Sequence, residues 1–402
     1  MKKLHLLAAV LSAVAAVSAA HAEGPLYTPA SSLIVQQREA TAPPAIRAKL
    51  EAFRAILRQN RLNFTVGYTR ALDQPRLTLL GDQDDPRMTP MRRVQVTNDA
   101  LQTLKGDEDA RVKYLLANPD MRRVLPDINN LTLGCNAGLH AFDWRTYGKV
   151  SPIRHQICGN CWAFAATAAY ESSQLMRNNA MTDESEQYAN DCATTDDGAD
   201  AGSCGGGLAT NALQHFVRVG DATEASDHYT GTDNMCSNPP TPMKAIAWGY
   251  VDPAVDFASR DKIKQALCTY GPLTTRMRVV SDLIFAYTGG TPPMDVYNEP
   301  VASDSDGGGH AVLIVGWDDN RGAWLIKNSW DTDWGENGFG WIGYNSNRIG
   351  RHTAWIKARS NFYVFNKALL QQLQPMRPQF VPPVPPGNQM QQQQRQNTQR
   401  YQ

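Results

Sequence analysis

The chain has 402 residues, 42% of them hydrophobic, and its 39 basic residues balance its 39 acidic ones. This length exceeds that of one average domain, and the apolar content suffices for a sizeable core. The balanced charge gives no sign of a nucleic-acid surface or a polybasic membrane anchor, so we expect no nucleic-acid partner.

The first 22 residues have the pattern of a secretory signal peptide. Met1–Lys3 form a short positive n-region, Leu6–Val17 are almost all apolar, and Ala20-His21-Ala22 is a small-x-small cleavage signal. The apolar run is too short for a membrane anchor, which needs about 20 residues. We therefore expect a secreted chain, periplasmic or extracellular, that starts near Glu23 and has no membrane span after cleavage.

Residues 23–130 are expected to form a separate pro-region. Residues 23–42 look irregular, and residues 63–130 are polar, with several prolines and no predicted element. Between 44 and 62, apolar residues recur at helical spacing and predict an amphipathic helix: Ile46, Leu50, Phe53, Ile56 and Leu57.

Residues 131–362 hold the expected folded domain. Helices are predicted over 161–177, which is rich in alanine, and over 261–270, which Gly271-Pro272 ends. Strand-like runs follow at 273–280, 311–317 and 323–327. A helical first half followed by a strand-rich second half predicts an α+β domain with two lobes.

Residues 363–402 are rich in glutamine and proline. Such a composition cannot bury a core, so a disordered tail is expected.

One cysteine lies where its chemistry would be unusual. Cys161 opens the alanine-rich helix within Cys158-Gly159-Asn160-Cys161-Trp162, and a helix N-terminus favours the thiolate. Seven cysteines are an odd number, so at least one thiol stays free unless it pairs between chains. The Cys-x-x-Cys spacing also fits a redox pair or half of a zinc site. The motif alone leaves these readings open, although no second Cys-x-x-Cys supports zinc.

The remaining motifs narrow the choice. Gln156–Trp162 is followed along the chain by Ser185-Glu186-Gln187, Cys204–Gly207, Gly309-His310 and Asn328-Ser329-Trp330. These blocks, in this order over residues 139–345, closely resemble the papain-like cysteine peptidases of the papain and cathepsin type. The resemblance implies a helical left lobe and a β-barrel-like right lobe, with the active-site cleft between them.

The resemblance also implies roles for individual residues. Cys161 would attack the peptide carbonyl as a thiolate, and His310 would carry the proton. Asn328 would orient the imidazole, and Trp330 would cover that hydrogen bond. Gln156 and the Cys161 backbone N–H would form the oxyanion hole. No metal or other cofactor is implied.

Substrate contacts are expected along one backbone edge. Gly206 and Gly207 would pair with an extended peptide. By resemblance, a set of small or apolar residues lines the main specificity pocket: Leu208, Ala209, Gly308 and Gly309. Arg276 stands where the family usually has a small apolar residue. It would favour acidic or polar side chains if it points into the pocket, and the alternative is that it faces solvent.

By resemblance, six cysteines pair and Cys161 stays free. The pairs are Cys158–Cys204 and Cys192–Cys236, which leaves Cys135–Cys268 as a third bridge.

The sequence departs from the family at Asn160 and Asp331, where Ser and Gly are usual. Similarity to the family's pro-region is weak and rests on Phe64–Gly67 and Asp73. Inhibition by residues 23–130 is therefore a hypothesis. We expect a cysteine endopeptidase that acts on protein or peptide substrates through an acyl-enzyme intermediate. The alternatives are an inactive papain-like binding protein and an acyltransferase.

Overall fold

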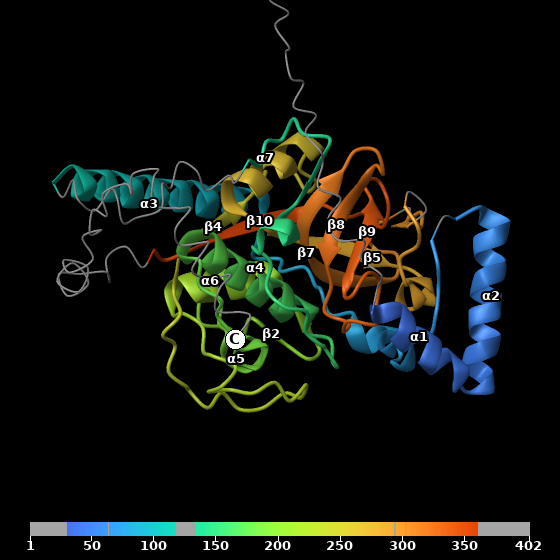
Figure 1. Ribbon diagram of the computed structural model, residues 1–402. Coiled ribbons are helices and arrows are strands. Elements are labelled where there is room, and N and C mark those ends of the chain that lie inside the picture. The colour runs from blue at the N-terminus through green and yellow to red at the C-terminus, as the bar shows by residue number, and fades with distance from the viewer. Residues whose placement is uncertain (1–29, 63, 118–133, 293–294, 302, 361–402) are drawn as a thin grey trace, which may run out of the picture. The chain divides into compact units, whose positions relative to one another are not determined.

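The computed structural model describes residues 30–62, 64–117, 134–292, 295–301 and 303–360 (Figure 1). The expected signal peptide and glutamine-rich tail lie outside these residues. The chain divides into one unit that ends at Arg359 and a second, Ser360–Gln402, of which only Ser360 is described. No helix in the described part is both long and apolar enough to cross a membrane.

The helices are α1 (Ala30–Ala40), α2 (Pro44–Asn60), α3 (Pro90–Ala117), α4 (Cys161–Asn178), α5 (Glu186–Cys192), α6 (Ala209–Arg218) and α7 (Arg260–Tyr270). The strands are β1 (Ala141–Asp143), β2 (Gly202–Ser203), β3 (Gly206–Gly207), β4 (Ala245–Tyr250), β5 (Leu273–Val279), β6 (Val296–Tyr297), β7 (Gly308–Asp318), β8 (Ala323–Lys327), β9 (Phe339–Gly343) and β10 (Arg351–Ala358). Figure 1 shows α4, α5 and α6 gathered in one region and β5, β7, β8 and β9 in another, so the predicted α+β class with two lobes is confirmed.

Helix α4 is buried around its whole circumference from Cys161 to Met176. Small alanine side chains allow neighbouring elements to approach it from all sides, because a thin helix needs little room. The helix ends where Asn179 adopts the left-handed conformation with φ 49°. Its first residue is therefore held rigidly in the interior.

Strand β7 is at the centre of the main sheet, whose order is β4-β10-β5-β7-β8-β9-β6, with β1 also paired to β7. All pairings are antiparallel except that of β6 with β9. Residues 309–318 of β7 are buried on both faces. Register with β5 places Met277 opposite His310 and Arg276 opposite Ala311.

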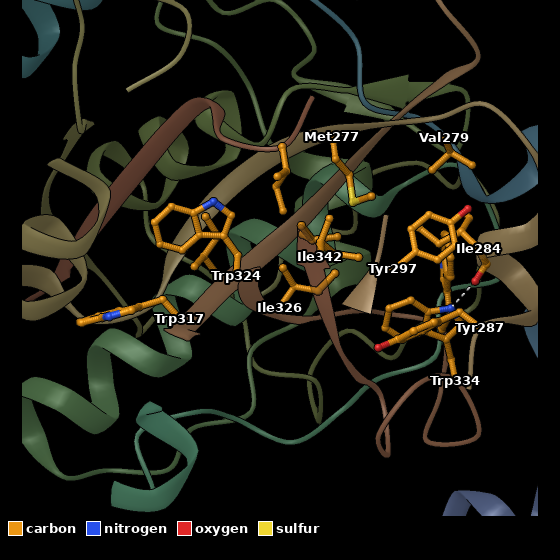
Figure 2. Packing of buried hydrophobic residues seen from close by; sticks show 14 of the residues in the cluster. Met277, Val279, Ile284, Tyr287, Tyr297, Trp317, Trp324, Ile326, Trp334 and Ile342 are labelled. Atoms are coloured by element: carbon orange, nitrogen blue, oxygen red, sulfur yellow. Dashed lines mark hydrogen bonds between the residues drawn. The ribbon is translucent and has the colours of Figure 1, made fainter. Parts of the chain in front are cut away.

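One face of this sheet packs a dense core (Figure 2). Ile326 and Ile342 face Met277 and Trp324, while Tyr287, Tyr297 and Trp334 form an aromatic group beside them. The indole N–H of Trp334 donates to the carbonyl of Ile284 at 2.7 Å, so this large ring is buried without an unpaired donor.

Two helices lie where no helix was predicted. Helix α1 falls in the stretch expected to be irregular, and α3 falls in the polar stretch after 63. Helix α3 begins at Pro90, where proline is tolerated, and the next proline is Pro119. It buries a narrow stripe of mostly polar residues: Arg93, Thr97 and Ala100. Hydrophobic periodicity cannot detect such a stripe.

Helix α3 packs on the folded domain instead of standing apart from it. The Tyr250 N–H of β4 donates to Thr97 Oγ1 at 3.0 Å, and Arg93 forms an ion pair with Asp256 at 2.9 Å. Helix α2, over Pro44–Asn60, agrees with the amphipathic helix predicted there, and buries Leu50, Phe53 and Leu57.

Disulfide bonds join Cys135 to Cys268, Cys158 to Cys204, and Cys192 to Cys236. These are the three pairs that were expected, and Cys161 is free and buried.

Candidate active site

Cys161 is the first residue of α4, and its Sγ lies against β7. The Ala311 backbone N–H donates to Sγ at 3.5 Å. Burial raises the pKa of the Cys161 thiol to about 12, with a further increase from the carboxylate of Asp82. The backbone amides of Ala311 and Gly81 oppose this increase, but the thiol stays protonated at neutral pH.

His310 lies on β7, directly before the residue that contacts the thiol. Its Nε2 is 2.8 Å from Asn328 Oδ1, whereas its Nδ1 has no hydrogen-bond partner. Burial lowers the pKa of His310 to about 4, so the ring is neutral near pH 7. Because the amide oxygen can only accept, Nε2 carries the proton and Nδ1 has a free lone pair.

Two neighbours fix this imidazole. The Ser329 backbone N–H donates to Asn328 Oδ1 at 2.9 Å, which orients the amide. The indole of Trp330 stacks on the imidazole, with centroids 4.5 Å apart and planes 24° apart. Asn328 and Trp330, which were predicted to orient and to cover His310, therefore both contact its ring.

Gln156 is buried beside the cysteine-bearing loop. Its Oε1 accepts from Ser329 Oγ at 2.7 Å, and its Nε2 donates to the carbonyls of Cys158 at 2.7 Å and Leu79 at 3.0 Å. The contact with Leu79 is notable, because this residue belongs to the expected pro-region.

Residues 79–85, which we call the strap, lie along the site as an added backbone segment. Gly207 N–H donates to the Gly81 carbonyl at 2.8 Å, and Gln83 N–H donates to the Gly207 carbonyl at 2.9 Å. On the other side, Asp82 N–H donates to the Gly309 carbonyl at 3.1 Å. The strap thus uses the backbone edge that was expected to receive a peptide at Gly206 and Gly207.

Glycines allow this close approach. A Cβ on Gly81 would lie 1.5 Å from the carbonyl oxygen of Gly159, and one on Gly309 would lie 2.1 Å from that of Asp82. A Cβ on Gly308 would meet the side chain of Leu80, 2.5 Å from its Cδ1. A side chain at Gly81 or Gly309 would therefore push the strap out of place.

Leu208 and Ala209 are buried at the start of α6. Leu208 lines an open groove beside Gly206 and Gly207, and Asp84 of the strap lines the same groove.

Arg276 points inward, so the alternative that it faces solvent is wrong. Only 5% of the residue is exposed. Its Nε donates to Asp82 Oδ2 at 2.6 Å, and its Nη1 donates to Asp84 Oδ1 at 2.6 Å. Strand β5 continues between buried neighbours on both sides, which is why a charged residue in it must find partners inside.

The two departures from the family pattern also contact neighbours. Asp331 adopts φ 67°, a conformation that suits glycine, and its carboxylate contacts His155 Nδ1 at 3.3 Å and Arg70 Nη1 at 2.5 Å. Asn160 accepts from the Tyr229 hydroxyl at 3.1 Å.

Sequence reasoning missed the strap. The signal that could have found it is an isolated glycine followed by an acidic run, Gly81-Asp82-Gln83-Asp84-Asp85, which complements the unusual arginine at 276. No group of three or more metal-ligating side chains occurs among the residues with described positions.

Comparison with known proteins agrees with this geometry. Residues 139–358 match the model of the papain family cysteine protease. A viral cathepsin of Heliothis zea nuclear polyhedrosis virus is 36% identical over 216 residues, which cover 52% of this chain and 53% of that protein. The chain therefore spans about half the length of this relative. Pro-cathepsin H of Mus musculus is 32% identical over 273 residues, covering 64% of this chain and 78% of that protein.

The likeness in structure extends beyond the domain that the family model matches. The digestive procathepsin L2 proteinase from Tenebrio molitor larval midgut superposes with a TM-score of 0.56 at 23% identity, covering 82% of this chain and 95% of that one. At this identity the match shows a shared fold. With the family model spanning more than half of the sequence, this chain belongs to the papain family of cysteine proteases.

Proposed function

We propose that this chain is the precursor of a secreted cysteine endopeptidase with Cys161 as its nucleophile. The observation that carries the proposal is the free thiol at the N-terminus of α4 beside His310 of β7, which is bonded to Asn328 just after β8. Membership of the papain family supports it.

His310 Nδ1, which has no other partner, takes the proton of the Cys161 thiol. The thiolate attacks the peptide carbonyl, and the Gln156 Nε2 and Cys161 backbone N–H groups bind the oxyanion. His310 then donates its proton to the leaving amine, and water hydrolyses the thioester. Asn328 keeps the same ring nitrogen protonated throughout.

The strap acts as an intramolecular inhibitor in this proposal. It holds the Gln156 amide through the Leu79 carbonyl and covers the Gly207 edge, so a peptide cannot reach either. Burial beneath it disfavours both charged forms, so the proton stays on the thiol and the attacking thiolate does not form beside a protonated imidazole. Removing the strap restores water to the cleft and lowers the cost of ionising the pair.

Secretion is supported by the disulfides. Three bridges among the described residues suit an oxidising compartment. The expected signal sequence, residues 1–22, fits the same route.

The test compares the folded full chain before and after limited proteolysis that removes the pro-region, with Cys161→Ala treated alongside. We expect hydrolysis of fluorogenic peptide amides only after processing, and none by Cys161→Ala. A thiol-directed epoxide should label Cys161 in the processed chain and label the full chain much more slowly.

Three results would contradict the proposal. Processed, reduced protein that hydrolyses no protein or peptide would indicate a binding protein. Transfer of the acyl group to an added amine without hydrolysis would indicate an acyltransferase. Activity that survives Cys161→Ala would remove Cys161 from the mechanism.

A further inference from the structure

The guanidinium of Arg276 is a buried charge whose carboxylate partners both come from the strap. Asp82 and Asp84 bind it at 2.6 Å each. The third partner is His352, whose Nδ1 lies 3.1 Å from Arg276 Nη1 and whose Nε2 lies 3.0 Å from Asp256. Within the described residues after 134, no carboxylate pairs with Arg276.

Removal of the strap therefore leaves this charge unpaired in the cleft. His352, held by Asp256, keeps the guanidinium in place but supplies no negative charge of its own. A substrate side chain that covers this charge takes away its water, so a carboxylate, which pairs with it, gains more here than a neutral group.

The charged Arg276 side chain starts from a position close to the reacting thiol. Arg276 pairs in register with Ala311, the residue whose N–H contacts Cys161 Sγ. Asp82, whose carboxylate binds Arg276, follows Gly81, whose backbone amide lies at the same sulfur. Its own N–H is bound by Gly309, and the next residue is bound by Gly207. The carboxylate thus reaches Arg276 from a backbone held between the two edges of the cleft, as an extended substrate would be held.

We propose that Arg276 is a specificity-determining residue, which selects substrates with an acidic side chain two residues before the scissile bond. The inference rests on the proposed peptidase function. Asp82 of the strap then takes the place of that side chain at Arg276. Its Oδ1 is buried without a hydrogen-bond partner, so the strap leaves one carboxylate oxygen unpaired.

The experiment uses blocked dipeptide coumarin amides that differ only at the residue two before the cleaved bond: Asp, Asn, Glu or Leu. Enzyme is obtained from the folded full chain by limited proteolysis. The Asp-to-Asn comparison preserves size and changes only charge. We expect kcat/KM for Asp to exceed that for Asn by at least tenfold, and Arg276→Met to bring the ratio close to one.

Two further variants control for misfolding and for the loss of an arginine from β5. Arg276→Met alone leaves Asp82 buried without its partner and could prevent folding, so the double variant Asp82→Asn with Arg276→Met removes both charges together. Arg278→Met is the matched control, because Arg278 lies on the same strand but donates to the carbonyls of Asp306 and Gly307 instead of the strap. It should keep the parent ratio.

The outcomes separate the two proposals. Cleavage that depends on Cys161 with an Asp-to-Asn ratio near one, or with a ratio unchanged in the Arg276 variants, overturns the specificity and leaves the peptidase proposal intact. If no amide is cleaved, Cys161→Ala enzyme is titrated with strap peptides, residues 76–89, that carry Asp or Asn at 82. At least tenfold tighter binding of the Asp peptide, lost with Arg276→Met, would support the acidic pocket even though the peptidase proposal had failed. Equal binding would overturn it.

Discussion

The amide of Asn328 fixes which nitrogen of His310 can accept a proton. Its oxygen accepts from both Nε2 of His310 and the Ser329 N–H, so it cannot turn without losing two bonds. The fixed amide holds the imidazole with Nδ1 free. An asparagine side chain that could rotate would not fix the ring in this way.

Asn328→Ala tests this role. Losing a hydrogen bond to a ring that becomes charged during the reaction costs roughly 1.5–3 kcal/mol, which corresponds to a kcat lower by about 10- to 100-fold. The processed enzyme should also show an altered pH dependence of kcat/KM, which a merely structural effect would not produce. Asn347→Ala, at a buried asparagine that binds the Arg278 carbonyl, is the control and should keep the profile. An unchanged profile in Asn328→Ala would contradict the assignment.

A group of buried acids joins α4, α5 and β8. Glu171 of α4, Glu184 and Glu186 are buried, and the charges of Glu171 and Glu186 act on Lys327, which closes β8 and donates to Ser151 Oγ at 2.7 Å. Both carboxylate oxygens of Glu184 lack a hydrogen-bond partner. Burial raises the pKa of Glu184 to about 8, and Glu171 adds to the shift. Arg154 also acts on Glu171 and Glu186, so these elements meet where two cations face three buried acids.

Glu184→Gln should change stability in a pH-dependent way. Because the folded chain holds the proton of Glu184 more tightly, the associated stability is present below pH 4.5 and is lost as the pH rises through about 8. The variant should match the parent near pH 5 and be more stable near pH 8.5, by an amount on the order of a few kcal/mol. Thermal unfolding at both pH values, in a Cys161→Ala background to prevent self-cleavage, measures this difference. Glu51→Gln, on the exposed face of α2, is the control, and an equal shift at both pH values would refute the explanation.

Helix α3 is attached to β4 through the Thr97 hydroxyl. Thr97→Val preserves shape but leaves the buried Tyr250 N–H without an acceptor, which costs about 1–3 kcal/mol. We expect a correspondingly lower free energy of unfolding in denaturant titrations of the full chain. Thr103→Val makes the same change on the exposed side of the same helix, where the hydroxyl binds only the Asp99 carbonyl, and should have little effect. If the two variants lose equal stability, the Thr97 contact does not anchor the helix.

The predictable elements are those whose pattern is apolar. Cys161–Asn178 and Ala323–Lys327 were placed from sequence because alanine-rich and apolar runs each favour one structure. Helix α3 was missed because it buries polar residues, and α1 was missed because its stretch looked irregular. Their contacts come from distant parts of the chain, which local periodicity does not report.

The same difference separates the candidate site from the strap. Cys161, His310 and Asn328 could be named because family motifs identify them. The strap carries no family motif, and its place is set by backbone bonds to Gly207 and Gly309 together with the pairing of Asp82 and Arg276. The inward direction of Arg276 was thus undecidable until its partners, 192 and 194 residues away in sequence, were located.

At the scale of the whole molecule, closure of the cleft depends on a single residue that has no side chain. Gly81 brings the strap close enough for its carbonyl to bind Gly207, and a Cβ there would lie 1.5 Å from the Gly159 carbonyl oxygen. Gly159 lies between Cys158, which is bonded to Cys204, and α4, which begins at Cys161. Its carbonyl is therefore held from both sides and resists displacement. The strap itself must leave.

Gly81→Ala should therefore open the full chain without processing. We expect peptide hydrolysis by the unprocessed variant and alkylation of Cys161 by iodoacetamide at least tenfold faster than in the parent, because the thiol regains access to water and its pKa falls from about 12. Gly106→Ala, in α3 with no atom within 4 Å of the added carbon, controls for the substitution itself. Should the Gly81 variant stay as slow to alkylate as the Gly106 control, with the chain folded, the strap would not be what protects Cys161. The inhibitory role would then have to lie with contacts elsewhere in the pro-region, such as those of α2 or the Arg70–Asp331 pair.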